Sequence, residues 1–467
     1  MGTTIVSIGG VTSAGGTTAL DTGAVATLVS SSAPEFVVTW SKTLASTIDI
    51  GDIAKATDSG STTYEYLITA ISGTQYTLIQ KVGGGTLNQN PATICAAVDE
   101  YGDCETIASF SFYRAFSTIT LFEGMVDDAS PTYWGSSDDV VGECHADSPF
   151  TDSRVYFTTK QSLASVTLTV YETDRHDGTA SSGVVIRPTA GSGHDNAIID
   201  VNIDNFIIEW IEIDLGSLDS TNTNKAVQLR GTNDDNIIRN NLIHNKGGNA
   251  GTNGLFMIHT VGAGSSSDTL SILNNIIYNI VETTDDSSSA ININQWQGTV
   301  NIYNNTVYNI ESDNSASTKP AIAFRYNGHA NQVANVKNNI ASKLVADTAA
   351  EHRAYWDVGT GTSNVDYNLS DDTTNATYEA QGTNRIIDAT AAQIDFLSIG
   401  VGTENLHLNT DSVCREAGVD LGTTNEVNID IDGVDRDATD VTWDMGADQA
   451  SVLGGSAGTA FIMFLDI

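Results

Sequence analysis

A short motif centred on an Asn-Asn pair returns four times in the middle of the chain. The copies are NIIRNNLIHN (Asn236–Asn245), LSILNNIIYNI (Leu270–Ile280), VNIYNNTVYNI (Val300–Ile310) and VANVKNNIASKL (Val333–Leu344). The pairs begin at residues 240, 274, 304 and 338, so the steps between them are 34, 30 and 34 residues. A step of this size indicates one supersecondary unit stacked on copies of itself. Because the apolar residues within each copy alternate, the unit is built from strands, and the repeat predicts an all-β solenoid.

A second series of apolar segments has a similar period and lies between the Asn-Asn motifs. Its members are AVQLR (Ala226–Arg230), GLFMIH (Gly254–His259), AININ (Ala290–Asn294) and AIAFR (Ala321–Arg325). Steps of 29, 35 and 31 residues result from aligning Leu229, Ile258, Ile293 and Phe324. We expect each strand to pair with its counterpart one coil away, at a distance of about 4.8 Å. In such a stack Asn tolerates the left-handed backbone of a bend, and its amide can bond along the axis.

The two series resemble the right-handed parallel β-helix superfamily, to which pectate lyases and many phage tailspikes belong. The resemblance covers residues 156 to 449, and the segments Glu416–Asp420 and Asp430–Gln449 look like the closing part of secreted or surface β-helix proteins. It implies a right-handed parallel β-helix. It does not imply one activity, since this scaffold carries lyases, hydrolases, adhesins and structural parts.

The chain is strongly acidic, with 58 Asp and Glu against 20 Lys and Arg and a net charge of −38. Phosphate binding needs clustered Lys and Arg, so we expect neither nucleic acid nor an anionic membrane as a partner. No run of 18 apolar residues is present, which argues against a membrane span. The N-terminus, MGTTIVSIGG, lacks the basic and apolar regions of a secretory signal. We therefore expect a protein assembled in a host cytoplasm and exposed on a virion surface, with an extracellular or cell-surface location as the alternative.

Changes in composition divide the chain into five parts. We predict a flexible N-terminal arm over residues 1–33, a small β head over 34–90, a linker with a capping helix over 91–152, the parallel β-helix over 153–449 and an apolar tail strand over 450–467. By analogy with phage proteins, the arm and head would dock onto other virion proteins. The tail would pair with a neighbouring subunit, so a homo-oligomer, most simply a trimer, is expected.

The capping helix is predicted from a local change of period. Ile119, Phe122 and Val126 recur at helical spacing, and Thr120 with Glu123 fits a capping box. A helix at this point would cover the open apolar end of the first coil.

The alignment of the second series predicts a glycan-contact surface. If Leu229 and its equivalents point inward, the next residues point outward on one face. The predicted contact residues are Arg230, His259, Asn294 and Arg325, with Trp296 and Tyr326 one step further along and Trp356 near the next coil. Charge pairing for carboxylates and flat faces for sugar rings are what an acidic glycan needs. The alternative is a solvated face whose arginines pair with loop acids.

Catalytic residues are harder to assign. Glycosidases need two carboxylates, about 5–5.5 Å apart in retaining enzymes and about 6.5–9.5 Å apart in inverting ones. Glu212 and Asp214 lie two residues apart on one face of the segment EWIEID, and Arg230 could serve as the base of a lyase. With so many acids in the chain such pairs arise by chance, so these three residues stand only as the enzymatic alternative.

No cofactor is required by the sequence, with Ca²⁺ as the one alternative. Asp430, Asp432 and Asp435 resemble a calcium loop at a glance, but Gly433 stands fourth where an EF-hand needs glycine sixth. Cys95 and Cys104 flank a short acidic loop and either bridge or stay reduced.

Three functions follow from these observations. The first is a non-enzymatic structural or adhesive protein on a bacteriophage surface that contacts host polysaccharide. The second is a polysaccharide-degrading tailspike, either a lyase or a glycoside hydrolase. The third is a secreted bacterial adhesin.

Overall fold

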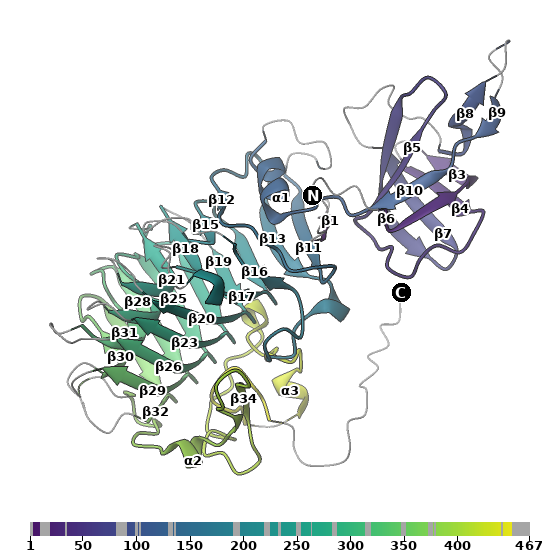
Figure 1. Cartoon of the computed structure of the whole chain (residues 1–467). Coiled ribbons are helices and arrows are strands. Elements are labelled where there is room, and N and C mark those ends of the chain that lie inside the picture. The colour runs from purple at the N-terminus through teal and green to yellow at the C-terminus, as the bar shows by residue number, and fades with distance from the viewer. Residues whose placement is uncertain are drawn as a thin grey trace.

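The structure is a computed structural model. It describes residues 3–9, 19–32, 35–80, 91–98, 101, 104–128, 134, 137–189, 197–218, 225–231, 235–248, 254–262, 264–282, 287–312, 319–346, 352–371, 377, 380–439 and 442–450. Within these residues two bodies stand out, a seven-stranded antiparallel barrel and a long parallel β-solenoid (Figure 1). The predicted all-β parallel helix is confirmed.

Three parallel sheets form the solenoid. The first contains, in spatial order, β1 (Thr3–Gly9), β11 (Asp139–His145), β13 (Ser165–Val170), β16 (Phe206–Glu209), β19 (Asn236–Arg239), β22 (Thr269–Leu273), β25 (Gly298–Tyr303), β28 (Gln332–Lys337) and β31 (Thr362–Asp366). The second contains β12 (Val155–Phe157), β15 (Ile199–Val201), β18 (Val227–Arg230), β21 (Leu255–Val261), β24 (Ser288–Asn292), β27 (Ala321–Tyr326) and β30 (His352–Asp357). The third contains β14 (Val185–Ile186), β17 (Glu212–Asp214), β20 (Leu242–Gly248), β23 (Ile276–Glu282), β26 (Thr306–Ser312), β29 (Ile340–Ala346) and β32 (Leu369–Ser370). Their inward faces enclose one continuous apolar core.

The register of the second sheet differs from the predicted alignment. Phe324 pairs with Ile291, Ile291 with Ile258, and Ile258 with Val227. Leu229 and Ile293 therefore lie two residues beyond the positions predicted for them. The error has a simple cause. Apolar residues stand at both inward positions of these strands, so a shift of two residues preserves the alternation that the prediction used.

The second asparagine of each pair forms a buried ladder inside the coils. Its members are Asn241, Asn275, Asn305 and Asn339, followed by Asn368 in the next coil. From Asn275 onward, each side-chain oxygen accepts from the backbone N–H and the side-chain amide of the asparagine one coil before it, at 2.9–3.1 Å. Each amide also donates to a backbone carbonyl of the preceding coil. The predicted bonding of amides along the axis is confirmed.

The first asparagine of each pair has a different role. Asn240, Asn274, Asn304 and Asn338 all have left-handed backbone, with φ between 53° and 57°. This conformation is costly for most residues but tolerated by Asn, and it turns the chain from the first sheet into the third. The side chains point outward, away from the core ladder, and bind another part of the chain, described below.

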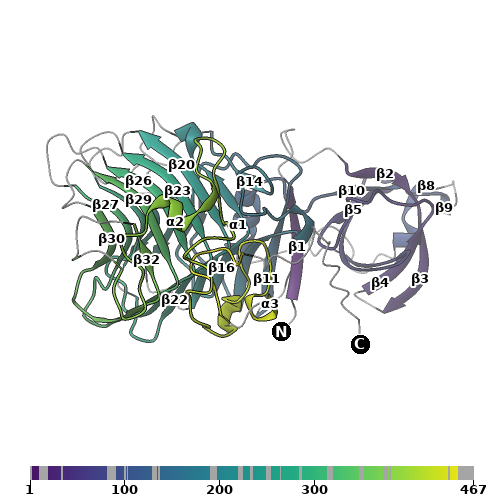
Figure 2. The same ribbon diagram turned by 90° about the horizontal axis from the view of Figure 1, so that it is seen from below.

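The N-terminal barrel draws on residues outside the predicted head. Its strands are β2 (Asp21–Ala24), β10 (Phe110–Tyr113), β5 (Ile53–Thr57), β6 (Thr63–Ser72), β7 (Gln75–Gln80), β4 (Glu35–Trp40) and β3 (Ala26–Ser32), in spatial order. Seen end-on they curl into a ring (Figure 2). Within it Trp40 packs edge to face on Phe112, and Phe110 packs at a tilt against Trp40 and Tyr66. The hairpin of β8 (Cys95–Val98) and β9 (Cys104–Ile107) lies at its far end and carries a Cys95–Cys104 disulfide.

The predicted N-terminal arm is therefore wrong for its described residues. Thr3–Gly9 forms β1, which pairs in parallel with β11 and begins the solenoid. Asp21–Ala24 and Ala26–Ser32 are barrel strands. The low charge that suggested an arm reflects burial at a sheet position instead, since Val6 and Ile8 are fully buried.

A buried ion network joins the barrel to the solenoid. Arg114 donates to both oxygens of Asp52 at 3.1 Å and to Asp147 at 3.0 and 3.2 Å. Ser7 of β1 donates to Asp52, and Tyr171 donates to Asp49 at 3.0 Å. Although Arg114 opposes it, burial raises the pKa of Asp52 to about 6. Breaking one partner of such a buried pair is strongly destabilising, so this network fixes how the two bodies meet.

A short helix closes the first coil as predicted. Helix α1 (Ile119–Val126) buries Ile119, Phe122 and Val126. Its N-cap is Thr118, whose hydroxyl accepts from the N–H of Leu121 at 3.1 Å. The predicted capping box is wrong, because the Thr120 hydroxyl donates to Asp152.

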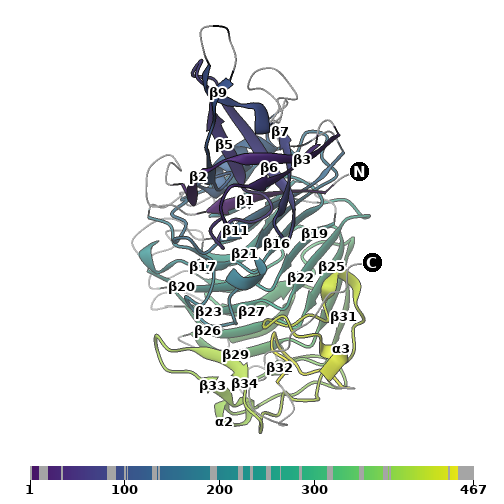
Figure 3. The same ribbon diagram turned by 90° about the vertical axis from the view of Figure 1, so that its right-hand side faces the viewer.

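The C-terminal segment, residues 380–450, lies along the outside of the coils (Figure 3). It contains α2 (Ala391–Ile394), β33 (Phe396–Ser398), β34 (Asn405–Leu408) and α3 (Arg436–Thr439). The stacked coils end at β32, so the solenoid stops before the predicted boundary at residue 449. The predicted tail strand over 450–467 lies outside the described residues except for Ala450.

The outward asparagines hold this segment in place. Asn240 and Asn274 donate to the carbonyl of Ile429, Asn304 to that of Val427, and Asn338 to that of Val419. One repeated position thus supplies a row of equivalent bonds to a segment that has no repeat of its own.

Candidate functional site

The outward face of the second sheet carries most of the predicted glycan-contact residues. Strand pairing aligns Tyr156, Asp200, Gln228, His259, Asn292, Arg325 and Trp356 in one row along the axis. Arg230 lies two residues further along its strand, next to Val261. Arg230 and Arg325 therefore share a face, although not the same row.

At one end of this face two arginines share one carboxylate. Arg230 donates to Asp200 at 2.6 Å and Arg154 donates to its other oxygen at 2.8 Å. Both guanidinium groups also lie over the ring of Tyr156, at 4.3 Å for Arg154 and 5.9 Å for Arg230. Asp200 is fully buried. This end matches the alternative prediction, in which an acid neutralises the arginines.

At the other end two arginines flank one indole. The guanidinium carbons of Arg353 and Arg325 lie 4.0 and 4.9 Å from the ring centre of Trp356. Arg325 donates to the amide oxygen of Asn292 at 3.0 Å, and its Nε has no partner among the described residues. Burial and the neighbouring Arg353 lower the pKa of Arg325. Within the described part of the chain Arg325 makes no ion pair, so its charge is available to an anion.

Three predicted residues do not serve the face as expected. Trp296 and Tyr326 are 1% and 0% exposed and belong to the core. Alternation along β27 puts Tyr326 inward beside outward Arg325, and Gln295 turns the chain with φ of 60°, which carries Trp296 into the core. His259 stacks on Phe256 at 5.0 Å, and burial lowers its pKa to about 3, so it adds no charge near neutral pH.

Asn294 lies beyond the end of β24. Its backbone N–H and carbonyl bond the Thr260 hydroxyl at 2.9 Å. Arg353, by contrast, was missed. It pairs with Ile322, three residues before Arg325 on the neighbouring strand, and the predicted outward series did not include that position.

Glu212 and Asp214, the enzymatic alternative, lie on the third sheet and not on the sheet of Arg230. Glu212 is fully buried, accepts from the Ser181 N–H and contacts Nε2 of His244 at 2.9 Å. Asp214 pairs with Arg187 at 2.9 Å. Against desolvation, the bonds from Gly216 and Arg187 lower the pKa of Asp214. Each carboxylate thus already has a structural partner, and Arg230 is not beside them.

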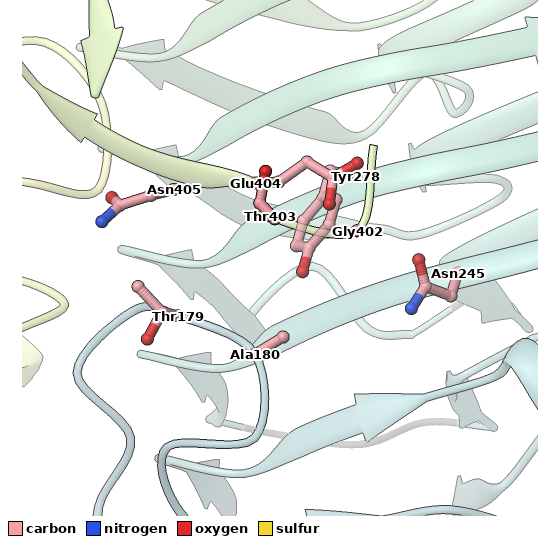
Figure 4. A pocket seen from close by; sticks show the side chains of 8 residues that line it. All are labelled: Thr179, Ala180, Asn245, Tyr278, Gly402, Thr403, Glu404 and Asn405. Atoms are coloured by element: carbon pink, nitrogen blue, oxygen red, sulfur yellow. The ribbon is translucent and has the colours of Figure 1, made fainter. Parts of the chain in front are cut away.

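A cleft of about 300 Å³ opens between the third sheet and the C-terminal segment (Figure 4). Its lining consists of Thr179 and Ala180 from a loop, Asn245 and Tyr278 from β20 and β23, and Gly402, Thr403, Glu404 and Asn405 from the C-terminal segment. Arg and Lys are absent from this lining. No pattern in the sequence predicts this cleft, because it forms only where a non-repeating segment docks onto the coils.

The predicted calcium residues are not gathered into one site. Asp430 accepts from the N–H groups of Asp432, Val434 and Gln449, and burial raises its pKa to about 7. Asp435 accepts from Asn428 at 2.8 Å and from the N–H of Asp437 at 3.0 Å. Both carboxylates therefore serve the loop itself.

Asp432 instead joins His407 and Asp448. One candidate ligand atom from each lies within 4.8 Å of the others. A histidine with two carboxylates is a donor set that divalent cations accept. Although burial would lower it, the ion pair with Asp432 raises the pKa of His407 to about 9. A cation would have to displace that proton, and calcium binding stays a prediction.

Among the described residues no helix is long and apolar enough to cross a lipid bilayer. No family model matches the chain, and neither the curated proteins nor the solved structures contain a match. Function must therefore be inferred from these side chains themselves.

Proposed function

We propose that this protein is a non-enzymatic surface protein that binds acidic polysaccharide on the outward face of its second sheet. The observation that carries the proposal is the Arg325–Trp356–Arg353 stack. It sets two guanidinium groups against one indole, with Arg325 free of any carboxylate partner in the described residues.

Charge supports this reading. The chain has a net charge of −38 with only 20 basic residues, so the rest of the surface repels acidic polymers. Arginine binds carboxylates through two parallel hydrogen bonds. The parallel coils repeat about every 4.8 Å, so a linear polymer can lie along several of them.

The non-enzymatic assignment is supported by the partners of the candidate carboxylates. Glu212 is engaged by His244 and Asp214 by Arg187. As its setting we propose the surface of a bacteriophage particle, with the barrel as the part that docks onto other particle proteins and the C-terminal tail as a contact between subunits. A secreted adhesin would use the same face, and a degrading tailspike is the enzymatic alternative.

Calorimetric titration with a polyuronate and with a neutral polysaccharide tests the binding. We expect the polyuronate to bind, the neutral polymer not to bind at this face, and affinity to fall with added salt. Arg325→Ala combined with Arg353→Ala should weaken binding at least tenfold. Arg187→Ala, on the third sheet, is the matched control and should have no effect.

An equal affinity of the Arg325 and Arg353 variant would overturn the assigned face. Release of new reducing ends or unsaturated sugars from the polyuronate, with or without Ca²⁺, would replace the non-enzymatic proposal by the tailspike.

A further inference from the structure

The cleft beside β23 differs in chemistry from the arginine face. It is enclosed by the loop at Thr179 and by the C-terminal segment (Figure 4). Its polar side chains are those of Thr179, Asn245, Tyr278, Thr403, Glu404 and Asn405. A volume of about 300 Å³ stands at the lower end of the range typical of small-molecule sites, which suits one or two sugar rings.

Tyr278 is the most informative group in the cleft. Its side chain is 3% exposed, and its ring stacks on His244 with centres 4.9 Å apart and planes 5° apart. Packing therefore fixes the ring. The hydroxyl makes no hydrogen bond within the described residues, and it lies at the centre of the lining between Glu404 and Ala180 (Figure 4). Because packing holds the ring and the hydroxyl has no partner among the described residues, the hydroxyl is placed for a ligand in the cleft.

The neighbouring groups complete a set of donors and acceptors. Glu404 accepts from Asn279 at 2.8 Å through Oε1, which leaves Oε2 as an acceptor. The amide oxygen of Asn405 accepts from the backbone N–H of His407 at 3.1 Å, so its Nδ2 remains as a donor. Donor and acceptor sites that alternate around a small space match a ligand rich in hydroxyl groups.

The charge of the cleft decides which hydroxyl-rich ligand fits. Among the described residues Glu404 has no cationic partner, so an acidic sugar would meet an uncompensated carboxylate. A neutral sugar meets no such repulsion, and its hydroxyls can donate to Glu404 and bond the phenol of Tyr278. We propose that this cleft binds a neutral sugar ring, as a second site that is independent of the acidic-glycan face.

Saturation-transfer NMR with neutral monosaccharides and disaccharides, and with a uronic acid for comparison, tests the proposal. We expect at least one neutral sugar to bind and the uronic acid not to bind at this site. Tyr278→Phe and Glu404→Gln should each weaken binding about three- to tenfold. Tyr303→Phe is the matched control, since its hydroxyl bonds Asn301 at 3.2 Å on the first sheet.

The binding experiments test the cleft independently of the proposed acidic-glycan face. Arg325→Ala should leave neutral-sugar binding unchanged, so either proposal can fail alone. Comparing the free sugar with a polymer that ends in it distinguishes a soluble ligand from the terminus of a glycan chain. Binding of no neutral sugar at high millimolar concentration, or unchanged binding by the folded Tyr278 and Glu404 variants, would overturn the site.

Discussion

The coils and the C-terminal segment are stabilised in opposite ways. In the coils the same contact recurs, with Asn275, Asn305 and Asn339 each bonding the next coil through equivalent atoms. In the C-terminal segment Arg436 alone makes six bonds to different groups, and it is fully buried. The coils distribute stability over many similar units, whereas the segment concentrates it in a few buried charges.

Sequence repetition stabilises the coils, but it cannot stabilise a segment that has no repeat. A stacked coil contacts only its neighbours, so its stability adds up along the axis. The segment has no stacked partner and depends on the outward asparagines and on its own buried ions. We therefore expect single substitutions to release the segment while the coils remain folded.

The largest effect is expected from Arg436→Met. The change removes a buried cation and leaves several carbonyls without donors, beside the buried Asp430, Asp444 and Asp448. Loss of one partner from such a network costs about 3–5 kcal/mol. Limited proteolysis should cut residues 380–450 early while the coils resist. Arg385→Met is the control, because this exposed arginine bonds only the carbonyl of Gly382 among the described residues. Cleavage of the coils at the same rate as the C-terminal segment would show that the two regions are not stabilised independently.

A smaller loss is expected from Asn305→Ala in the middle of the core ladder. The change leaves the buried carbonyl of Ile272 and the buried N–H of Asn275 without the hydrogen-bond partner that Asn305 provides. Each unsatisfied group costs about 1–3 kcal/mol. Urea unfolding should show a lower midpoint for the coils. Asn335→Ala should cost much less, because this half-buried residue of β28 donates only from its side-chain amide to that of Asn301 at 2.9 Å. An equal drop in the urea midpoint for both variants would show that the buried ladder stabilises the coils no more than the half-buried asparagines do.

The two regions should also respond to pH with opposite sign. Burial lowers the pKa of His259 in the coils to about 3, next to Lys225, Arg325 and Arg230. Its contribution is full above about pH 6.5 and is lost as pH falls toward 3. Burial raises the pKa of Asp444 to about 6 despite Arg436 and two backbone donors. Its contribution is full below about pH 4 and is lost as pH rises through 6.

Thermal unfolding from pH 7.5 to pH 5 checks this contrast. In the parent protein the coils should lose about 2 kcal/mol of stability between pH 7.5 and pH 5 through His259, and His259→Asn should abolish that loss. The C-terminal segment should gain stability over the same range through Asp444, and Asp444→Asn should abolish that gain. Parallel pH curves for both variants and the parent protein would show that neither group sets the dependence.

The smallest effect is expected where the two regions touch. Asn338 exchanges bonds with Val419 at 2.8 and 3.0 Å and has φ of 57°. Asn338→Gly removes the two hydrogen bonds, but glycine adopts the positive φ without strain. Asn338→Ala removes the same bonds and also places alanine in a backbone conformation that is costly for it. We expect alanine to be less stable than glycine by about 1 kcal/mol, measured by urea unfolding. A difference of zero would mean that docking alone matters at this position.

Repetition explains how much the sequence could predict. The four Asn-Asn motifs identified the stacked coils and the amide ladder, because equivalent atoms recur at each copy. They did not fix the register of the second sheet, where Val227 and Leu229 are both apolar and inward. They also could not place Trp296, whose direction depends on the turn at Gln295.

The remaining features depend on contacts between distant residues. Arg325 was found from its strand position, but the availability of its charge depends on Arg353 and Trp356 around it. The cleft at Tyr278 needs Glu404, which lies 126 residues away in a segment without a repeat. Likewise β1 joins the solenoid by pairing with β11, which follows it in the sequence only after the whole barrel.

Because the chain runs from β1 through the barrel before it reaches β11, the barrel is an insertion between two neighbouring strands of the first sheet. The chain leaves the solenoid after Gly9 and returns at Phe116, and these two residues are already bonded, N–H to carbonyl, at 3.0 Å. A short loop from Gly9 to Phe116 could therefore replace everything between them, with the loss of the bond that the Gly51 carbonyl accepts from the N–H of Ser7 on β1. Two proteins with such coils could therefore exchange barrels while each kept the outward face of its own second sheet.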